Sequence, residues 1–316
     1  MAGDVQKFAE HARAEIGKVI VGQEEVINLM LAVLICGGHA LMEGVPGIAK
    51  TLAVKVLAHI CGLDFQRVQC TPDLMPADIL GANVFNMASS TFTLRRGPVF
   101  TGLLLVDEVN RVPPRTQSAL LESMEERQVT LDGTCYPLSP FFTVFATQNP
   151  VEFEGTYPLP EAQLDRFLLK IRVPYPAADK EVEILERYQR GFDPHHIETL
   201  GLSPVDPGSL AAARREVADL KVEPGIFRYI VAVVQRTRDW PALSLGGSPR
   251  ATVALMLAAK TLAAMDGRDY LIPDDVKAAA PPVLRHRLLV KPEADLEGIS
   301  SDHVVAEVLA AVEVPK

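Results

Sequence analysis

Short apolar runs alternate with stretches of helical periodicity over the first half of the chain, a pattern typical of a parallel sheet flanked by helices. The run from Leu103 to Val106 is apolar throughout and lies between Gly102 and Asp107, as expected for a strand buried on both faces. Similar runs occupy residues 39–43, 65–70, 142–147 and 168–173. We therefore expect an α/β fold built on a five-stranded parallel sheet.

Two further stretches predict β-hairpins inserted between these elements. Residues 83–98 alternate on either side of central turn residues. Residues 128–138 place Asp132 and Gly133, a common hairpin turn, between two alternating runs. Both hairpins are candidate surfaces for contact with a substrate or a neighbouring subunit.

The pattern changes after Pro174, where strand-like runs stop and alanine-rich helical stretches follow. These stretches are residues 178–190, 207–219, 224–238, 249–265 and 273–285, with a further helix expected at 302–312. The segment 174–176 predicts a linker, because each proline restrains its predecessor to extended geometry. We expect two domains: an α/β domain over residues 1–174 with both hairpins, and a small all-helical domain with a C-terminal tail over residues 175–316.

Composition limits the class of protein. Hydrophobic residues make up 48% and charged residues 22%, the balance of a globular protein. A net charge of -9 without a basic run argues against nucleic-acid binding. The longest apolar stretch, 29–42, is shorter than the roughly 20 residues that a membrane helix needs.

Two smaller features bear on the cellular setting. The N-terminal segment carries acidic residues and lacks the apolar core of a secretory signal, so we expect a cytoplasmic location. The four cysteines form no CxxC pair, and we expect reduced thiols in the core rather than a metal site.

The segment GVPGIAKT matches the phosphate-loop pattern G-x-x-x-x-G-K-[ST] and lies between a predicted strand and a predicted helix. Its glycines let successive amides face phosphate groups, and the following helix adds its positive N-terminal end. Lys50 is expected to contact the β- and γ-phosphates, and Thr51 to supply a hydroxyl to Mg²⁺. The predicted ATP-binding residues of this segment are Gly44, Val45, Pro46, Gly47, Ile48, Ala49, Lys50, Thr51 and Leu52.

The segment LLLVDEVNR delivers two adjacent acids at the end of an apolar strand. Burying acidic side chains at the end of a strand costs free energy unless a cation binds there. We expect Asp107 to hold Mg²⁺, directly or through water, and Glu108 to act as general base toward the attacking water.

The segment ATQNP ends another apolar strand with polar residues. Parallel strands that end together place such residues at one sheet edge, so Asn149 is expected to orient the lytic water or contact the γ-phosphate. The alternative is a simple turn, because Asn-Pro commonly starts turns.

Taken together, these motifs resemble the AAA+ ATPases, and five segments narrow the resemblance to the MoxR family. In unbroken order the segments are VGQEEV, GVPGIAKT, GPVFTGLLLVDEVNR, ATQNP and LPEAQLDRF. The resemblance implies an AAA+ P-loop core with a small all-α lid, ATP and Mg²⁺ as cofactors, and a ring of subunits that is habitually hexameric. It also implies a protein client, and MoxR-like proteins often work with a partner that carries a von Willebrand factor A domain.

The resemblance assigns further residues. Val21, Gly22 and Gln23 lie where AAA+ proteins wrap the adenine, although this loop could instead cap the helix that starts near Glu24.

Two arginines complete the implied site. Arg166 falls where relatives present an arginine finger to the adjacent subunit; the alternative is an internal salt bridge with Asp165 or Glu161. Arg250 matches the second sensor of the lid, behind Ser248 as N-cap, and could serve its own site or a neighbour's.

Three functions are compatible with these features. The first is an ATP-hydrolysing, chaperone-like factor for protein assembly or metal cofactor insertion. The second is a nucleotide-gated scaffold with incidental turnover. The third, a nucleic-acid motor, is opposed by the acidity of the chain.

Overall fold

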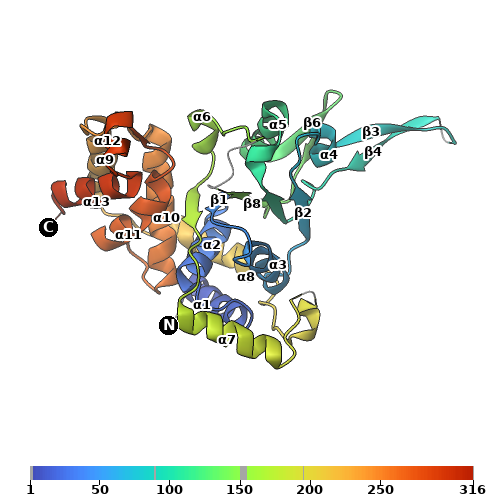
Figure 1. Ribbon diagram of the computed structural model, residues 1–316, viewed down its shortest axis with the longest axis horizontal. Helices are drawn as coiled ribbons and strands as arrows, with labels where there is room; N and C mark the ends of the chain where they lie inside the picture. The colour runs from blue at the N-terminus through green and yellow to red at the C-terminus, as the bar shows by residue number, and fades with distance from the viewer. Residues whose placement is uncertain (1–2, 89, 150–154, 195, 316) are drawn as a thin grey trace.

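The computed structural model describes residues 3–88, 90–149, 155–194 and 196–315. Its centre is a parallel sheet in the order β2-β5-β8-β1-β9 (Figure 1). The strands are β1 (Ala40–Glu43), β2 (Phe65–Gln69), β5 (Leu103–Asp107), β8 (Thr143–Gln148) and β9 (Leu169–Arg172). The predicted α/β fold with a five-stranded parallel sheet is therefore confirmed.

The sheet is covered on both faces. Alternate residues of a strand point to opposite faces, so Leu103 and Leu105 join one hydrophobic cluster while Leu104 and Val106 join another. The first cluster includes residues of α1, α2 and α3, and the second includes residues of α5. These helices are α1 (Asp4–Gly17), α2 (Glu24–Cys36), α3 (Lys50–Ile60) and α5 (Pro114–Glu126), with a short α4 (Pro76–Leu80), the 3₁₀ turn η1 (Val109–Arg111) and α6 (Glu161–Leu164).

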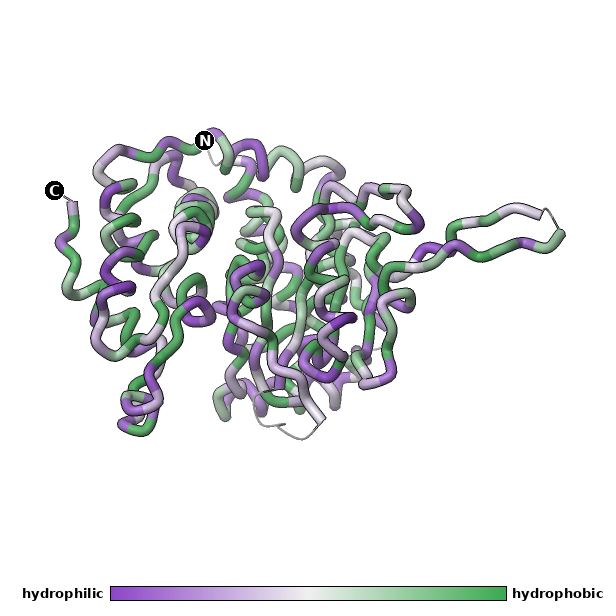
Figure 2. Tube along the Cα trace, turned by 90° about the horizontal axis from the view of Figure 1, so that it is seen from above, coloured by the Kyte–Doolittle hydropathy of each residue, from purple (hydrophilic) through white to green (hydrophobic). Residues whose placement is uncertain are grey.

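Both predicted hairpins are present. The first, β3 (Gly81–Asn86) with β4 (Thr91–Arg96), projects from the body as a long arm (Figures 1 and 2). Two glycines pack its base, where a Cβ on Gly81 or Gly97 would lie 2.3 Å from a backbone oxygen. The second hairpin joins β6 (Gln128–Leu131) to β7 (Thr134–Pro137).

The C-terminal half is mostly helical. It contains α7 (Ala178–Gln189), η2 (Ile197–Thr199), α8 (Ser209–Asp219), α9 (Pro224–Arg238), α10 (Pro249–Met265), α11 (Pro273–Leu284), α12 (Pro292–Leu296) and α13 (Ser301–Ala311). Helices α9 to α13 group together on the side of the molecule opposite the arm (Figure 1). Helix α8 packs on α1 and α2 instead. The domain boundary near residue 174 stays a prediction.

Two expectations for the remaining chain were wrong. Strands do occur after Pro174, because β10 (Leu243–Leu245) pairs with β11 (Leu289–Val290), although both are too short to leave a period-two pattern. Cys135 is not a core thiol: it is exposed on the second hairpin, whereas Cys61 and Cys70 are buried. Within the described residues, no cluster of side chains suits a metal ion by His, Cys, Asp and Glu alone, and no helix is long and apolar enough to cross a membrane.

His39 connects three elements beneath the sheet. Its Nε2 donates to the carbonyl of Met124 at 3.1 Å, and its Nδ1 accepts from the amide of Val144 at 2.9 Å. Burial, with smaller effects from the positive charges of Arg127 and Arg214, lowers the pKa of His39 to about 4. The neutral imidazole therefore belongs to the folded state.

We predict that this histidine makes the fold sensitive to acid. As pH falls from 6.5 toward about 4, His39 takes up a proton in the unfolded chain but not in the folded one, so the free energy of unfolding decreases. Urea unfolding at several pH values should give His39→Gln a slope smaller than the parent's by about 1.4 kcal/mol per pH unit in this window. His303→Gln, which replaces an exposed histidine, is the control, and equal slopes for parent and His39→Gln would contradict the prediction.

Candidate functional site

The loop between β1 and α3 is tightly curled. Gly47 has φ 85° and Ala49 has φ 60°, both in the left-handed region that non-glycine residues rarely adopt. A Cβ on Gly44 would lie 2.7 Å from the carbonyl oxygen of Val173. The loop thus turns the chain back on itself, and α3 begins directly at Lys50.

The structure brings the predicted phosphate and metal residues to one cavity of about 430 Å³ at the carboxyl edge of the sheet. Its lining comes from the curled loop, the start of α3, β2, the ends of β5 and β8, and α7. Among the lining residues are Pro46, Gly47, Ala49, Lys50, Thr51, Leu52, Asp107, Glu108 and Asn149. Gly44, Val45 and Ile48 lie outside the lining of this cavity.

The carboxylate of Asp107 is buried and contacted from three neighbouring elements. The hydroxyl of Thr147 donates to Oδ1 at 3.1 Å, and that of Thr51 lies 3.4 Å from Oδ2. Arg67 Nε donates to Oδ2 at 2.7 Å. We did not predict Arg67, although its strand β2 runs beside β5 and three of its five residues are polar and exposed, which indicates a strand that is partly in contact with solvent.

Glu108 is held in a strained backbone conformation, with φ 59° and ψ 50°. Its amide donates to Thr147 Oγ1 at 2.9 Å. Its carboxylate Oε2 accepts from Gln69 Nε2 at 2.9 Å and from Arg111 at 3.1 Å. This conformation directs the side chain into the cavity rather than along the strand.

Lys50 lies between the loop and the two acids. Its Nζ donates to the Gly44 carbonyl at 2.5 Å. Burial lowers the pKa of Lys50, while the charges of Asp107 and Glu108 raise it. The ammonium therefore sits in the field of both carboxylates, within the same cavity.

A second cavity of about 350 Å³ adjoins the first, since both are lined by Pro46, Gly47, Ala49, Leu52 and Tyr188. Its other walls are largely apolar and include Val21, Ile48, Tyr175, Ile184 and Phe192. A flat apolar ring attached to a polyanion would match this pair of cavities.

Gln23 supplies a polar group to the second cavity. Its Nε2 donates to the Ile48 carbonyl at 3.1 Å, while its Oε1 is buried without a hydrogen-bond partner among the described residues. An unpaired buried acceptor suits a ligand that brings an N–H group. Gln23 precedes α2 but its side chain caps no amide there, and Gly22 lines a separate cavity beside Lys180.

The two predicted arginines lie elsewhere. Neither Arg166 nor Arg250 lines these cavities in the part of the chain that the structure describes. Arg166 makes no ion pair with Asp165, Glu161 or any other described residue, and Asp165 pairs with Arg287 at 2.6 Å instead. Arg250 stands in the first turn of α10 and pairs with Glu125 of α5.

The predicted cap of α10 is present. The Ser248 hydroxyl accepts from the Ala251 amide at 3.4 Å, and Pro249 is the first helical residue.

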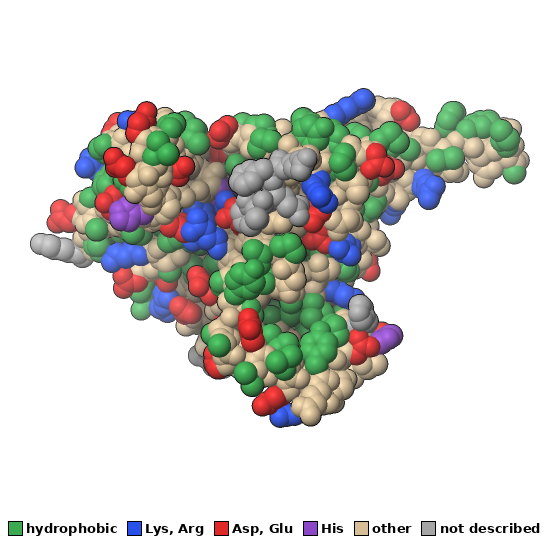
Figure 3. Space-filling view, in the orientation of Figure 1, with side chains coloured by type: hydrophobic (Ala, Val, Ile, Leu, Met, Phe, Trp, Pro, Cys, Tyr) green, Lys and Arg blue, Asp and Glu red, His purple; other side chains and the backbone are tan. Residues whose placement is uncertain are grey.

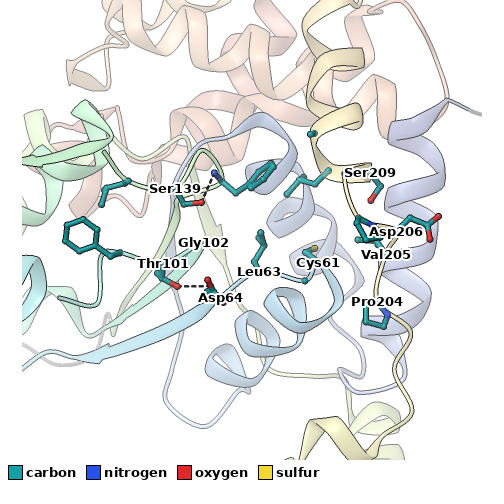
Figure 4. Close-up of a pocket in the computed structure, with 18 of the residues that line it drawn as sticks. Cys61, Leu63, Asp64, Thr101, Gly102, Ser139, Pro204, Val205, Asp206 and Ser209 are labelled. Atoms are coloured by element: carbon teal, nitrogen blue, oxygen red, sulfur yellow. Dashed lines mark hydrogen bonds between the residues drawn. The ribbon is translucent and has the colours of Figure 1, made fainter. Parts of the chain in front are cut away.

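Another cavity, of about 700 Å³, opens at the opposite edge of the sheet, next to the amino ends of β2, β5 and β8 (Figure 4). Leu63, Thr101 and Ser139 line it, and Thr101 donates to the Asp64 carbonyl at 2.8 Å. None of the predicted site residues borders it within the described chain. In open α/β sheets ligands bind beyond the carboxyl ends of the strands, so the two adjoining cavities are the candidate site.

Comparisons with known proteins agree with this geometry. Residues 39–169 match a family model described as ATPase family associated with various cellular activities, and residues 235–308 match one described as AAA lid domain. YeaC of Bacillus subtilis is 46% identical over 99% of this chain and 96% of its own. Chaperone MoxR1 of Mycobacterium tuberculosis is 43% identical over 97% of this chain and 82% of its own.

The fold also matches a solved structure. The crystal structure of a candidate ATPase from Cytophaga hutchinsonii has 41% identity and a TM-score of 0.90, covering 99% of this chain and 96% of that one. Similarity of this degree over nearly the whole chain shows that the protein belongs to the MoxR family of AAA+ ATPases.

Proposed function

We propose that the protein is an Mg²⁺-dependent ATPase that acts as a hexameric ring and remodels or matures a client protein. The convergence of the curled loop, Lys50, Asp107 and Glu108 on one cavity supports this proposal most strongly. The adjoining apolar cavity with Gln23 accommodates the base. The relative named Chaperone MoxR1 supports a client protein as the target.

Each part of ATP hydrolysis is assigned to particular residues of this chain. The loop amides and the Lys50 ammonium bind the phosphates, and Asn149 orients the attacking water. Glu108 accepts the proton of that water as its oxygen bonds to the γ-phosphorus and the bond to the ADP oxygen breaks.

A hydroxyl and a carboxylate oxygen 3.4 Å apart, from Thr51 and Asp107, are the hard oxygen ligands that Mg²⁺ prefers, so these two residues would hold the ion. When bound, Mg²⁺ neutralises charge on the β- and γ-phosphates.

The position of the arginines supports the proposed ring. Arg166 and Arg250 stand apart from the cavities of their own chain, whereas phosphoryl transfer gains from a cationic fork at the transferring group. A neighbouring copy that contributes Arg166 makes a head-to-tail contact, which gives a ring when the rotation between copies closes and a filament when it does not; the family resemblance favours the ring of six.

The projecting arm offers a surface for the client or for a partner with a von Willebrand factor A domain. Apolar side chains gather toward its tip (Figure 3), where Met87 is 88% and Phe92 is 71% exposed. Exposed apolar groups of this kind favour contact with another protein.

Replacing Lys50 by alanine should weaken Mg-ATP binding at least about tenfold, because hydrogen bonds to charged groups contribute roughly 1.5–3 kcal/mol. Isothermal titration calorimetry measures the change. Lys7→Ala removes an exposed lysine of α1 and should bind as the parent does. Unchanged affinity in Lys50→Ala would refute the phosphate-loop assignment.

Glu108→Gln should bind ATP with an affinity within a few fold of the parent's and hydrolyse it roughly 10²–10⁴-fold more slowly, because the amide cannot accept the proton. Phosphate release and nucleotide binding are both measured. Glu122→Gln, at an exposed position of α5, is the control. Client activity that persists without hydrolysis would favour the scaffold over the ATP-driven factor.

Arg166→Ala should leave nucleotide binding near normal and lower turnover at least about a hundredfold. Mixing it with Glu108→Gln should restore activity at roughly a quarter of the interfaces, where an intact Glu108 meets an intact Arg166. Steady-state phosphate release against mixing ratio tests this. A mixture as inactive as its components would exclude a site shared between subunits.

A further inference from the structure

The end of α11 is bound to the outer edge of the sheet. Three consecutive residues, Arg285, His286 and Arg287, donate to backbone carbonyls of the segment 167–170, which leads into and begins the edge strand β9. Arg166 lies immediately before this segment. The lid helix therefore contacts the turn that carries the proposed finger.

Arg287 makes the largest share of these bonds. Its Nε donates to Asp165 Oδ1 at 2.6 Å. One terminal nitrogen donates to the carbonyls of Asp165 at 3.2 Å and Phe167 at 2.6 Å, and the other to those of Leu168 at 3.0 Å and Val283. All five guanidinium N–H groups are thus used.

Arg287 binds the backbone on both sides of Arg166. The carbonyls on either side of it, from Asp165 and Phe167, both accept from the same nitrogen of Arg287. The Arg287 side chain is only 2% exposed, and a guanidinium buried to this extent is tolerated only when its donors are satisfied. The backbone of the Arg166 turn is consequently fixed in the one conformation that satisfies Arg287.

The same cluster reaches the second arginine. Asp165 Oδ2 accepts from the Ser248 hydroxyl at 2.9 Å, and Ser248 caps the helix in whose first turn Arg250 stands. Asp165 therefore joins Arg287, just after α11, to the start of α10 through its two carboxylate oxygens.

We propose that Arg287 is a positioning residue for Arg166, holding the finger at the angle at which it meets the nucleotide of a neighbouring copy. The inference rests on the proposed function of Arg166. Lysine cannot replace Arg287, because an ammonium has three donors and no planar fork with which to bind four residues.

The test is a double-mutant cycle on kcat in the full-length protein. Arg287→Lys should lower kcat at least about tenfold with KM for ATP changed less than about threefold, and the double variant Arg166→Ala/Arg287→Lys should be no slower than Arg166→Ala. Mixing Arg287→Lys with Glu108→Gln should restore turnover, as mixing Arg166→Ala does.

Arg268→Lys is the control, since Arg268 is a partly buried lid arginine whose ion pairs, with Asp266 and Asp275, stay inside the lid. It should lower the melting temperature without lowering kcat below that temperature. Should Arg287→Lys fail to fold, Asp165→Asn, which removes the charge but keeps an acceptor, should show the same non-additivity with Arg166→Ala.

Three results would overturn the inference. An unchanged kcat in Arg287→Lys, or losses that multiply in the double variant, would show that Arg287 acts on stability or on another group, while the role of Arg166 would stand. An unchanged kcat in Arg166→Ala would remove the finger itself, and with it the task assigned to Arg287.

Discussion

A buried carboxylate at the end of an apolar strand determines the arrangement of this site. All residues of β5 are buried, and Asp107 is 7% exposed at its last position. Such a charge needs cationic or hydrogen-bonding partners, and each of its partners comes from a different element: Thr51 from α3, Arg67 from β2 and Thr147 from β8. The register of the sheet and the start of α3 are thereby tied to one carboxylate.

The edge strand β9 presents a second constraint. An open sheet edge carries carbonyl groups that need partners, and here Arg285 donates to that of Lys170 in β9, while His286 and Arg287 donate to those of Phe167 and Leu168 just before the strand. A chain of ion pairs strengthens the same contact between the lid and the sheet. It runs from Glu43 at the end of β1 through Arg172 to Asp302 and Arg285. Polar side chains of the lid thus bind the edge of the sheet, a position where another fold would add a strand.

The fold could be predicted because its signals are local. Apolar runs, the phosphate-loop glycines and the cap at Ser248 each occupy a few consecutive residues. Arg67, Gln69 and Arg287 could not be found in this way, since the carboxylates that they bind lie 39 to 122 residues away and only the tertiary structure pairs them. Gly22 was assigned to the adenine site by the family resemblance, but it lines a separate cavity, whereas Val21 and Gln23 on either side of it line the apolar cavity.

The glycine-packed base of the arm has a mechanical consequence. Helix α4 leads directly into β3 and packs on α5, the helix that follows Asp107 and Glu108 by a short 3₁₀ turn. At Gly81 and Gly97 the two backbone segments are in direct contact with no side chain between them. We therefore expect little bending between α4 and the arm. Strands of this length extend roughly 20 Å. A small rotation of α4 would therefore move the tip of the arm through a larger distance than its base.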